Sequence, residues 1–172
     1  MRISGSDITK ARKRLLQMHR ESNVGHIGGN LSCLDALMVL YNEFITADDR
    51  FILSKGHSAG ALYTALWSIG HLSDDALKTF HKDGTLLAGH PPAAGISDIL
   101  FATGSLGHGL SLAAGTAQAL KLKRQPGTVY CLTSDGEWQE GSTYEAMVFA
   151  AHHGLNNLKI LVDHNRLQGF GR

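Results

Sequence analysis

One segment in the second half of the chain limits the fold more than any other, because it reads as strand, turn, helix and strand. Two apolar runs, residues 129–132 and 158–162, bound this segment. Between them, three residues lie at the spacing of one helix face: Ala146, Phe149 and Ala150. A strand, a helix and a strand in this order form a βαβ unit with parallel strands. The segment therefore predicts an α/β fold with a parallel sheet flanked by helices.

Polar residues follow both of these strands. Asp135-Gly136 comes directly after the first strand, and Asn165 follows the second, thirty residues further on. The carboxyl ends of parallel strands lie at one edge of the sheet, where ligands of open α/β folds bind, so we expect Asp135 and Asn165 to meet. Their oxygens are the hard ligands that Mg²⁺ or Ca²⁺ prefers. Gly136 and the helix N-terminus after it favour an anion, so the segment predicts a metal-bridged phosphate.

The same residues resemble a known family motif. Asp135-Gly136, followed at this spacing by Asn165, resembles the diphosphate motif of thiamine-diphosphate enzymes. Three flanking groups narrow the resemblance to the transketolase family, especially its split-gene N-terminal subunits: Glu137, Glu140-Gly141 and Glu145-Ala146. The family motif usually begins with glycine, where this chain has Ser134. This departure is small, since the metal and phosphate contacts fall on the next two residues.

The resemblance implies a cofactor and a metal ion as well as the thiamine-diphosphate-binding fold. Thiamine diphosphate would bind with Mg²⁺ (or Ca²⁺) at the strand ends. The expected metal ligands are Asp135, Asn165 and the carbonyl of Leu167, and Gly136 and Asn165 are also expected to contact the cofactor. Mg²⁺ takes about six ligands, so diphosphate oxygens and water would complete its shell. Metal and cofactor are therefore expected to bind together.

Three loops carry a histidine next to glycine: His26, His57 and His90. Each alone is typical of a turn histidine, whereas together they indicate imidazoles gathered at the mouth of one sheet. By the resemblance, His57 would contact the cofactor phosphate. His26 and His90 would be catalytic residues, which bind the sugar hydroxyls and move protons during C–C cleavage.

The loop Gly104-Ser105-Leu106 resembles the cofactor loop of the family. Its backbone would reach the diphosphate, and Leu106 would pack near the aminopyrimidine. The alternative interpretation is a glycine-rich start of a helix. His108, which follows, is given no role.

Two glutamates of the predicted helix, Glu140 and Glu145, have two interpretations. They can belong to a solvated helix surface. In the family, the matching glutamates lie at the dimer interface and link two active sites. Both interpretations stay open.

Capping and periodicity predict the remaining elements. Ser6 or Asp7 would cap a first helix to about residue 21, and Ser32 with Asp35 resembles a capping box for a second helix to about residue 41. Ser73 would cap a short helix through residue 80. The other elements are a strand at residues 51–53, a helix at 59–69 and a helix ending near residue 120.

Composition excludes several classes of function. Sixteen Lys and Arg against fifteen Asp and Glu give a net charge of +1, which argues against nucleic acid or an anionic membrane surface as the main partner. Cys33 and Cys131 lack metal-ligand spacing and are expected to be buried free thiols. The first residues lack the apolar stretch of a signal peptide, and no apolar run approaches membrane-spanning length. We therefore expect a cytoplasmic protein.

The resemblance also implies what this chain would need. Family members continue beyond the position of Arg172, so residues 1–172 are expected to form one diphosphate-binding domain that is incomplete relative to the family. A second, pyrimidine-binding domain supplies a glutamate that activates the cofactor. No glutamate of this chain sits in a matching context: Glu21, Glu43, Glu137, Glu140 and Glu145. A pyrimidine-domain (C-terminal) transketolase subunit is therefore the expected partner, in a homodimer or heterotetramer.

The expected function follows from this resemblance. A transketolase would transfer a two-carbon ketol unit between sugar phosphates. The nearest alternative enzyme uses pyruvate and resembles deoxyxylulose-phosphate synthase, although the histidine loops favour transketolase. A third interpretation is a non-catalytic remnant that keeps the fold and an interaction surface. We also expect the strand at residues 158–162 to expose apolar surface, so the isolated chain should self-associate.

Overall fold

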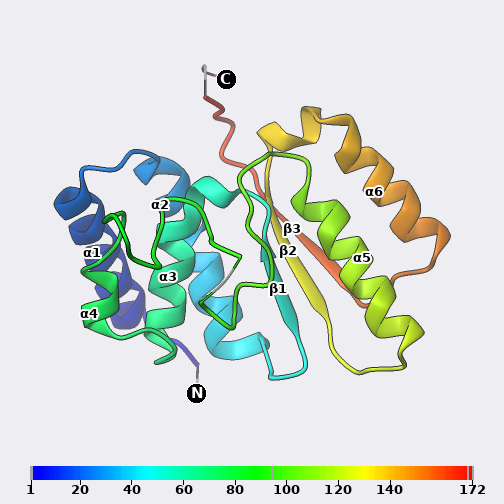
Figure 1. Cartoon of the computed structure of the whole chain (residues 1–172), viewed down its shortest axis with the longest axis horizontal. Helices are drawn as coiled ribbons and strands as arrows, with labels where there is room; N and C mark the ends of the chain where they lie inside the picture. The colour runs from blue at the N-terminus through cyan, green and yellow to red at the C-terminus, as the bar shows by residue number, and fades with distance from the viewer. Residues whose placement is uncertain (1, 94, 170, 172) are drawn as a thin grey trace.

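A three-stranded parallel sheet forms the centre of the computed structural model, which describes residues 2–93, 95–169 and 171 (Figure 1). The strands are β1 (Arg50–Leu53), β2 (Val129–Ser134) and β3 (Leu158–Asp163), in the order β1-β2-β3. The central strand β2 pairs in parallel with both neighbours. This architecture confirms the predicted α/β fold with a parallel sheet and a βαβ unit.

Helices cover both faces of the sheet (Figure 1). On one face lie α1 (Gly5–Ser22), α2 (Ile27–Val39) and α3 (Ala59–Ser68), and on the other lie α5 (Gly109–Leu122) and α6 (Gly141–His152). The remaining helical pieces are short: a π-helical turn η1 (Leu40–Phe44), the 3₁₀ turns η2 (Gly56–Ser58) and η3 (Gly136–Gln139), and α4 (Asp74–Leu77).

Successive residues of the strands serve two separate cores. Leu53 and Leu132 pack in the core beneath α1, α2 and α3, whereas Ile52 and Cys131 pack in the core beneath α5 and α6. A parallel strand that is buried on both faces reads as a continuous apolar run, which is why residues 129–132 were recognisable. The predicted burial of both cysteines as free thiols is confirmed, since Cys33 and Cys131 are 1% and 0% exposed.

Two helix starts differ from the sequence prediction. The N-cap of α1 is Ser4, not Ser6 or Asp7. Its hydroxyl accepts a hydrogen bond from the Asp7 N–H (3.3 Å), and the Asp7 carboxylate accepts one from the Ser4 N–H (3.1 Å). Asp7 is therefore the third helical residue of a capping box, and that spacing fixes the cap three residues earlier.

The helix α2 begins at Ile27 and not at the predicted Ser32 box. Gly28 and Gly29 precede the predicted capping box, and they are helical because tertiary contacts hold them. The Gly29 carbonyl accepts hydrogen bonds from Lys55 Nζ and Ser58 Oγ, both at 2.9 Å. Ser32 therefore lies inside the helix, where its hydroxyl donates to Asp163 Oδ2 at 2.6 Å.

The helix capped by Ser73 is shorter than predicted. The Ser73 hydroxyl accepts a hydrogen bond from the Ala76 N–H at 3.0 Å, as expected of an N-cap, but α4 ends at Leu77. The chain continues to Phe80 in turns, with bonds such as Phe80 N–H to the Leu77 carbonyl. The predicted strand at 51–53, the helix at 59–69 and the end of a helix near residue 120 are confirmed within one or two residues.

Apolar side chains are exposed along β3, as predicted. Ile160 and Val162 are 36% and 44% exposed on the face of α5 and α6. On the opposite face, an open groove of about 530 Å³ is lined mostly by apolar residues of α2, η1, β2 and β3. Among the described residues, β3 pairs with β2 alone.

None of the helices within residues 2–93, 95–169 and 171 has the length and hydropathy needed to cross a membrane.

Replacing the exposed pair on β3 should reduce self-association. The double variant Ile160→Thr, Val162→Thr keeps β-branched residues but removes apolar surface from an open edge. Light scattering against protein concentration should show less association than in the wild type. The control is Leu122→Gln, which changes a leucine that is 74% exposed at the end of α5. Equal scattering by the double variant and the wild type would show that β3 does not drive association.

Candidate functional site

The loops that follow the three strands meet at one edge of the sheet. This is the edge from which the chain leaves β3 for its C-terminus, in the upper part of Figure 1. Residues 54–57 follow β1, residues 135–136 follow β2 and residues 164–165 follow β3. The register places Ser134 opposite Asp163, so the last two loops start side by side.

Asp135 and Asn165 meet at one turn, as the parallel topology predicted. Asp135 Oδ2 accepts a hydrogen bond from the Arg166 N–H (2.6 Å), and Oδ1 accepts one from the Gly136 N–H (3.0 Å). Asn165 Oδ1 accepts a hydrogen bond from the Leu167 N–H at 2.8 Å. Each of these oxygens keeps a further lone pair for a ligand.

The chemistry of this turn fits a hard cation. An open hollow of about 330 Å³ adjoins it, lined by Asp135, Gly136 and Leu167 among others. Within residues 2–93, 95–169 and 171, no group of three or more His, Cys, Asp or Glu side chains could hold a metal ion. The donors at the turn itself are the Asp135 carboxylate, the Asn165 amide oxygen and main-chain carbonyls, which suit Mg²⁺ or Ca²⁺.

The three loop histidines form one cluster. The ring centroids of His26 and His57 are 5.4 Å apart, and those of His26 and His90 are 6.3 Å apart. Burial, followed by the charges of Lys55 and the neighbouring histidines, lowers the pKa of His57 to about 4. Partial burial and the nearby His26 also lower the pKa of His90. His57 and His90 are therefore neutral near pH 7, when one ring nitrogen can accept a proton.

A buried asparagine holds two of these histidine loops together. Asn30 is 1% exposed, and its Nδ2 donates to the carbonyls of His26 (2.9 Å) and His57 (3.1 Å). Its Oδ1 accepts from the Ala61 N–H at 2.8 Å. Asn30 was not among the residues predicted from the sequence, although a lone asparagine within an apolar helix was a usable signal because a buried amide needs partners.

The loop at 104–107 lies against the histidine loops. A Cβ on Gly56 would lie 2.5 Å from the Thr103 carbonyl oxygen, so this backbone rests directly on the turn after β1. A Cβ on Gly104 would lie 2.8 Å from Cδ2 of His90. Ser105 is exposed and Leu106 is half-buried. The structure thus places this loop at the strand ends, while its contacts with a cofactor stay a prediction.

A buried ion pair underlies the same edge. Lys55 is fully buried, and its ammonium group contacts Asp163, whose side chain is only 9% exposed. Asp163 Oδ2 also accepts from Ser32 Oγ (2.6 Å) and from Asn165 Nδ2 (3.4 Å). The amide nitrogen of Asn165 therefore faces Asp163, and its oxygen is left for the turn at Leu167. Sequence reasoning gave Lys55 and Asp163 no role.

The glutamates Glu140 and Glu145 are both exposed near the start of α6. The same helix exposes Tyr144 (53%), Met147 (38%) and Val148 (70%). This exposure agrees both with a solvated surface and with an interface, so the two interpretations stay open.

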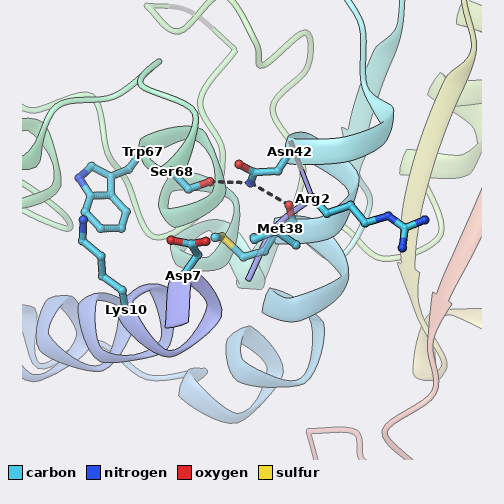
Figure 2. Close-up of a pocket in the computed structure, with 8 residues that line it drawn as sticks. Arg2, Asp7, Lys10, Met38, Asn42, Trp67 and Ser68 are labelled. Atoms are coloured by element: carbon cyan, nitrogen blue, oxygen red, sulfur yellow. Dashed lines mark hydrogen bonds between the residues drawn. The ribbon is translucent and has the colours of Figure 1, made fainter. Parts of the chain in front are cut away.

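A separate hollow of about 360 Å³ lies away from the strand ends, between α1, the end of α2, η1 and α3 (Figure 2). In it, Asn42 Nδ2 donates to Ser68 Oγ (3.0 Å), and Lys10 Nζ lies 5.1 Å from the centroid of the Trp67 ring. None of the predicted site residues lines this hollow.

The fold and the strand-end loops define an α/β domain with a candidate ligand site at the carboxyl edge of a parallel sheet, where ligands of such folds bind. The family model of the thiamine diphosphate binding domain of transketolase matches residues 7–171. The chain belongs to the transketolase family and carries its thiamine diphosphate binding domain. The resemblance stated from the sequence is thereby confirmed.

Curated relatives support this assignment. The chain is 41% identical over 168 residues to an apulose-4-phosphate transketolase subunit of Phocaeicola vulgatus, covering 92% of this chain and 59% of that protein. It is 37% identical over 166 residues to 6-deoxy-6-sulfo-D-fructose transketolase subunit SqwG of a Clostridium species, covering 91% and 60%. The chain thus spans about three fifths of the length of these relatives.

Solved structures agree. The transketolase of Campylobacter jejuni superimposes with a TM-score of 0.88 at 31% identity, over 96% of this chain and 28% of that chain. The transketolase of Leishmania mexicana superimposes with a TM-score of 0.87 at 27% identity, over 98% of this chain and 28% of that chain.

The lowered pKa of His57 predicts a pH dependence of stability. In the unfolded chain this histidine has its ordinary value of 6.5, whereas in the fold its pKa is about 4. As the pH falls from about 7 to about 5, the unfolded state binds a proton that the folded state does not, so stability is lost. Urea denaturation of His57→Gln should show a smaller loss over this range. The control is His108→Gln, at an exposed histidine; an unchanged slope in His57→Gln would contradict the prediction.

Proposed function

We propose that residues 1–172 form one diphosphate-binding domain of a transketolase that transfers a two-carbon ketol unit between sugar phosphates. The observation that carries this proposal is the meeting of Asp135 and Asn165 at one turn, beside the histidine cluster and the loop at 104–107. Family membership supports it, since the matching family model describes the domain that binds thiamine diphosphate.

The proposed metal ion is Mg²⁺, held by Asp135, Asn165 and the carbonyl of Leu167. These donors are hard oxygens, and the described turn leaves each side-chain oxygen a free lone pair. Gly136 and Asn165 would lie at the diphosphate. His57 and the backbone of the loop Gly104, Ser105 and Leu106 would contact the cofactor from the opposite side. Thiamine diphosphate supplies the carbanion chemistry when it is bound.

His26 and His90 are the proposed catalytic residues. Their rings lie 6.3 Å apart above the cofactor loops, close enough to contact hydroxyl groups on one substrate. The lowered pKa of His90 keeps its imidazole neutral at pH 7, so it can accept a hydroxyl proton during C–C cleavage and return it.

The proposed partner is a pyrimidine-domain subunit, in a homodimer or heterotetramer. Two relatives are named as subunits of transketolases, and the chain spans about three fifths of each. The exposed apolar residues of β3 and α6 offer surface for contacts between subunits. These relatives are named for apulose-4-phosphate and 6-deoxy-6-sulfo-D-fructose, so pentose phosphates and sulfosugars are the substrates to test first.

The donor assay is the direct test of this function. The chain, produced with a pyrimidine-domain subunit encoded next to it, should transfer a ketol unit from a ketose phosphate to an aldose phosphate. Pyruvate should not serve as donor. Turnover with pyruvate alone would favour the deoxyxylulose-phosphate-synthase-like alternative. No turnover with any donor, despite a stable complex, would favour a non-catalytic interaction protein.

Mg²⁺ and thiamine diphosphate should bind cooperatively, each raising the affinity of the chain for the other. Two side-chain oxygens and one carbonyl cannot fill a shell of about six ligands, so Mg²⁺ needs the diphosphate and the diphosphate needs Mg²⁺. Calorimetry of thiamine diphosphate should therefore show at least about tenfold tighter binding with Mg²⁺ than without it.

The variant Asp135→Asn should lose most of the gain that Mg²⁺ gives, because a neutral amide replaces the charged ligand. Asp83→Asn is the matched control, since Asp83 is exposed and lies outside the strand-end loops. Equal affinity of the wild type with and without Mg²⁺ would contradict the metal assignment.

A further inference from the structure

Glu137 is a fully buried carboxylate behind the candidate cofactor site. It lies in η3, directly after Asp135-Gly136, and is 0% exposed. Its Oε1 accepts hydrogen bonds from the Ser134 N–H (2.7 Å) and the Ser134 hydroxyl (3.5 Å), and its Oε2 accepts one from the Gly107 N–H (3.0 Å) and one from the Ser54 hydroxyl. Both oxygens are therefore used, and the three donor residues all belong to the chain itself.

These three donors belong to three different loops. Ser54 begins the loop after β1, Ser134 ends β2 before the Asp135-Gly136 turn, and Gly107 closes the loop at 104–107. One side chain thus connects the loops that carry His57, Asp135 and the predicted cofactor backbone. No other side chain described above reaches all three.

The contact at Gly107 is fixed from both sides. Gly107 has φ of +83°, and a Cβ there would lie 2.6 Å from Cβ of Glu140. Its N–H donates to Glu137, and its carbonyl accepts from Ser142 Oγ at 2.9 Å. The end of the loop is therefore held to the segment between η3 and the first turn of α6, with no room for a side chain.

We propose that Glu137 is a positioning residue, which sets the loop at 104–107 at the distance from the Asp135-Gly136 turn that a diphosphate requires. This inference rests on the proposed function. Glu137 would not touch the cofactor. It would act through Gly107, Ser54 and Ser134, as outer partners orient the groups that bind a ligand.

The geometry requires a carboxylate and not merely a side chain of the same shape. In Glu137→Gln, one of the two oxygens becomes an NH₂ group. Whichever oxygen is replaced, the new donor faces a backbone N–H, either of Ser134 or of Gly107. A buried donor that faces another donor leaves both without a partner, so one loop must move.

The test uses Glu137→Gln beside Thr143→Val in the full chain. Thr143 is buried, and its hydroxyl donates to the Glu137 carbonyl at 2.9 Å. That carbonyl keeps a second bond from the Glu140 N–H (3.1 Å), so the control removes a buried hydrogen bond from the same turn without touching the three loops. Two readouts are measured: affinity for thiamine diphosphate with Mg²⁺ by calorimetry, and amide hydrogen exchange of residues 103–107 without ligand.

Glu137→Gln should bind the cofactor about tenfold more weakly and exchange faster at residues 103–107, while Thr143→Val should match the wild type in both readouts. Ser54→Ala removes one hydroxyl donor to Glu137 and keeps the carboxylate. Its cofactor affinity and its exchange rate at residues 103–107 should lie between those of Glu137→Gln and Thr143→Val. It serves in place of Glu137→Gln if thermal melting shows that the latter does not fold.

The outcomes separate this inference from the proposed function. Failure of the wild-type chain to bind thiamine diphosphate would overturn the proposed function and this inference with it. Binding by the wild type with unchanged affinity and unchanged exchange in Glu137→Gln and Ser54→Ala would overturn the role of Glu137 alone.

Discussion

Two carboxylates, the fully buried Glu137 and the largely buried Asp163, hold the ends of the parallel strands in place. Strands of a parallel sheet stop at one edge, and the loops beyond them carry polar backbone groups that the sheet ladder no longer pairs. Glu137, just after β2, accepts from the backbone N–H groups of Ser134 and Gly107 and from the Ser54 hydroxyl. Asp163, at the end of β3, faces the ammonium of Lys55 and the hydroxyl of Ser32. Removing the Glu137 carboxylate would leave buried neutral donors on Ser54, Gly107 and Ser134 without partners, at a cost of about 1–3 kcal/mol for each. Removing the Asp163 carboxylate would leave the buried Lys55 ammonium without its counter-charge.

The charged pair of Lys55 and Asp163 lies in the layer beneath the strand-end loops, whereas the imidazoles of His57 and His90 in those loops are neutral near pH 7. The Lys55 ammonium lies beneath the histidine cluster and disfavours a second positive charge on His57, in the same direction as burial. The lysine is itself held by Asp163 and the Gly29 carbonyl, so it stays below the loops. The candidate site therefore presents acceptor nitrogens of His57 and His90 near neutral pH, while the charged Lys55 and Asp163 lie in the layer underneath.

The sequence predicted the parts of this site that local pattern and topology determine. The apolar run of β2 and the βαβ order were enough to bring Asp135 and Asn165 together, although they lie thirty residues apart. Asn30 and Lys55 were missed because their roles come from long-range hydrogen bonds, to His57 in one case and to Asp163 in the other. The start of α2 was wrong for the same reason. Glycines that favour a loop locally are helical here because the turn after β1 donates to the Gly29 carbonyl. Periodicity carries no information about such contacts.

The backbone of His26 has a consequence for how its chemistry can be studied. This residue precedes α2 in the left-handed conformation, with φ of +65°, which costs a non-glycine residue roughly 1–2 kcal/mol unless its surroundings hold it. Its carbonyl accepts from the Asn30 N–H and from the Asn30 side chain, and this pair of bonds keeps the peptide in place. Histidine and asparagine are among the residues enriched in the left-handed region, whereas alanine is not. An alanine at this position would therefore lose the imidazole and also add a backbone penalty, so two effects would be mixed in one measurement. Exchanging histidine for asparagine keeps a residue suited to this backbone and would isolate what the imidazole itself contributes.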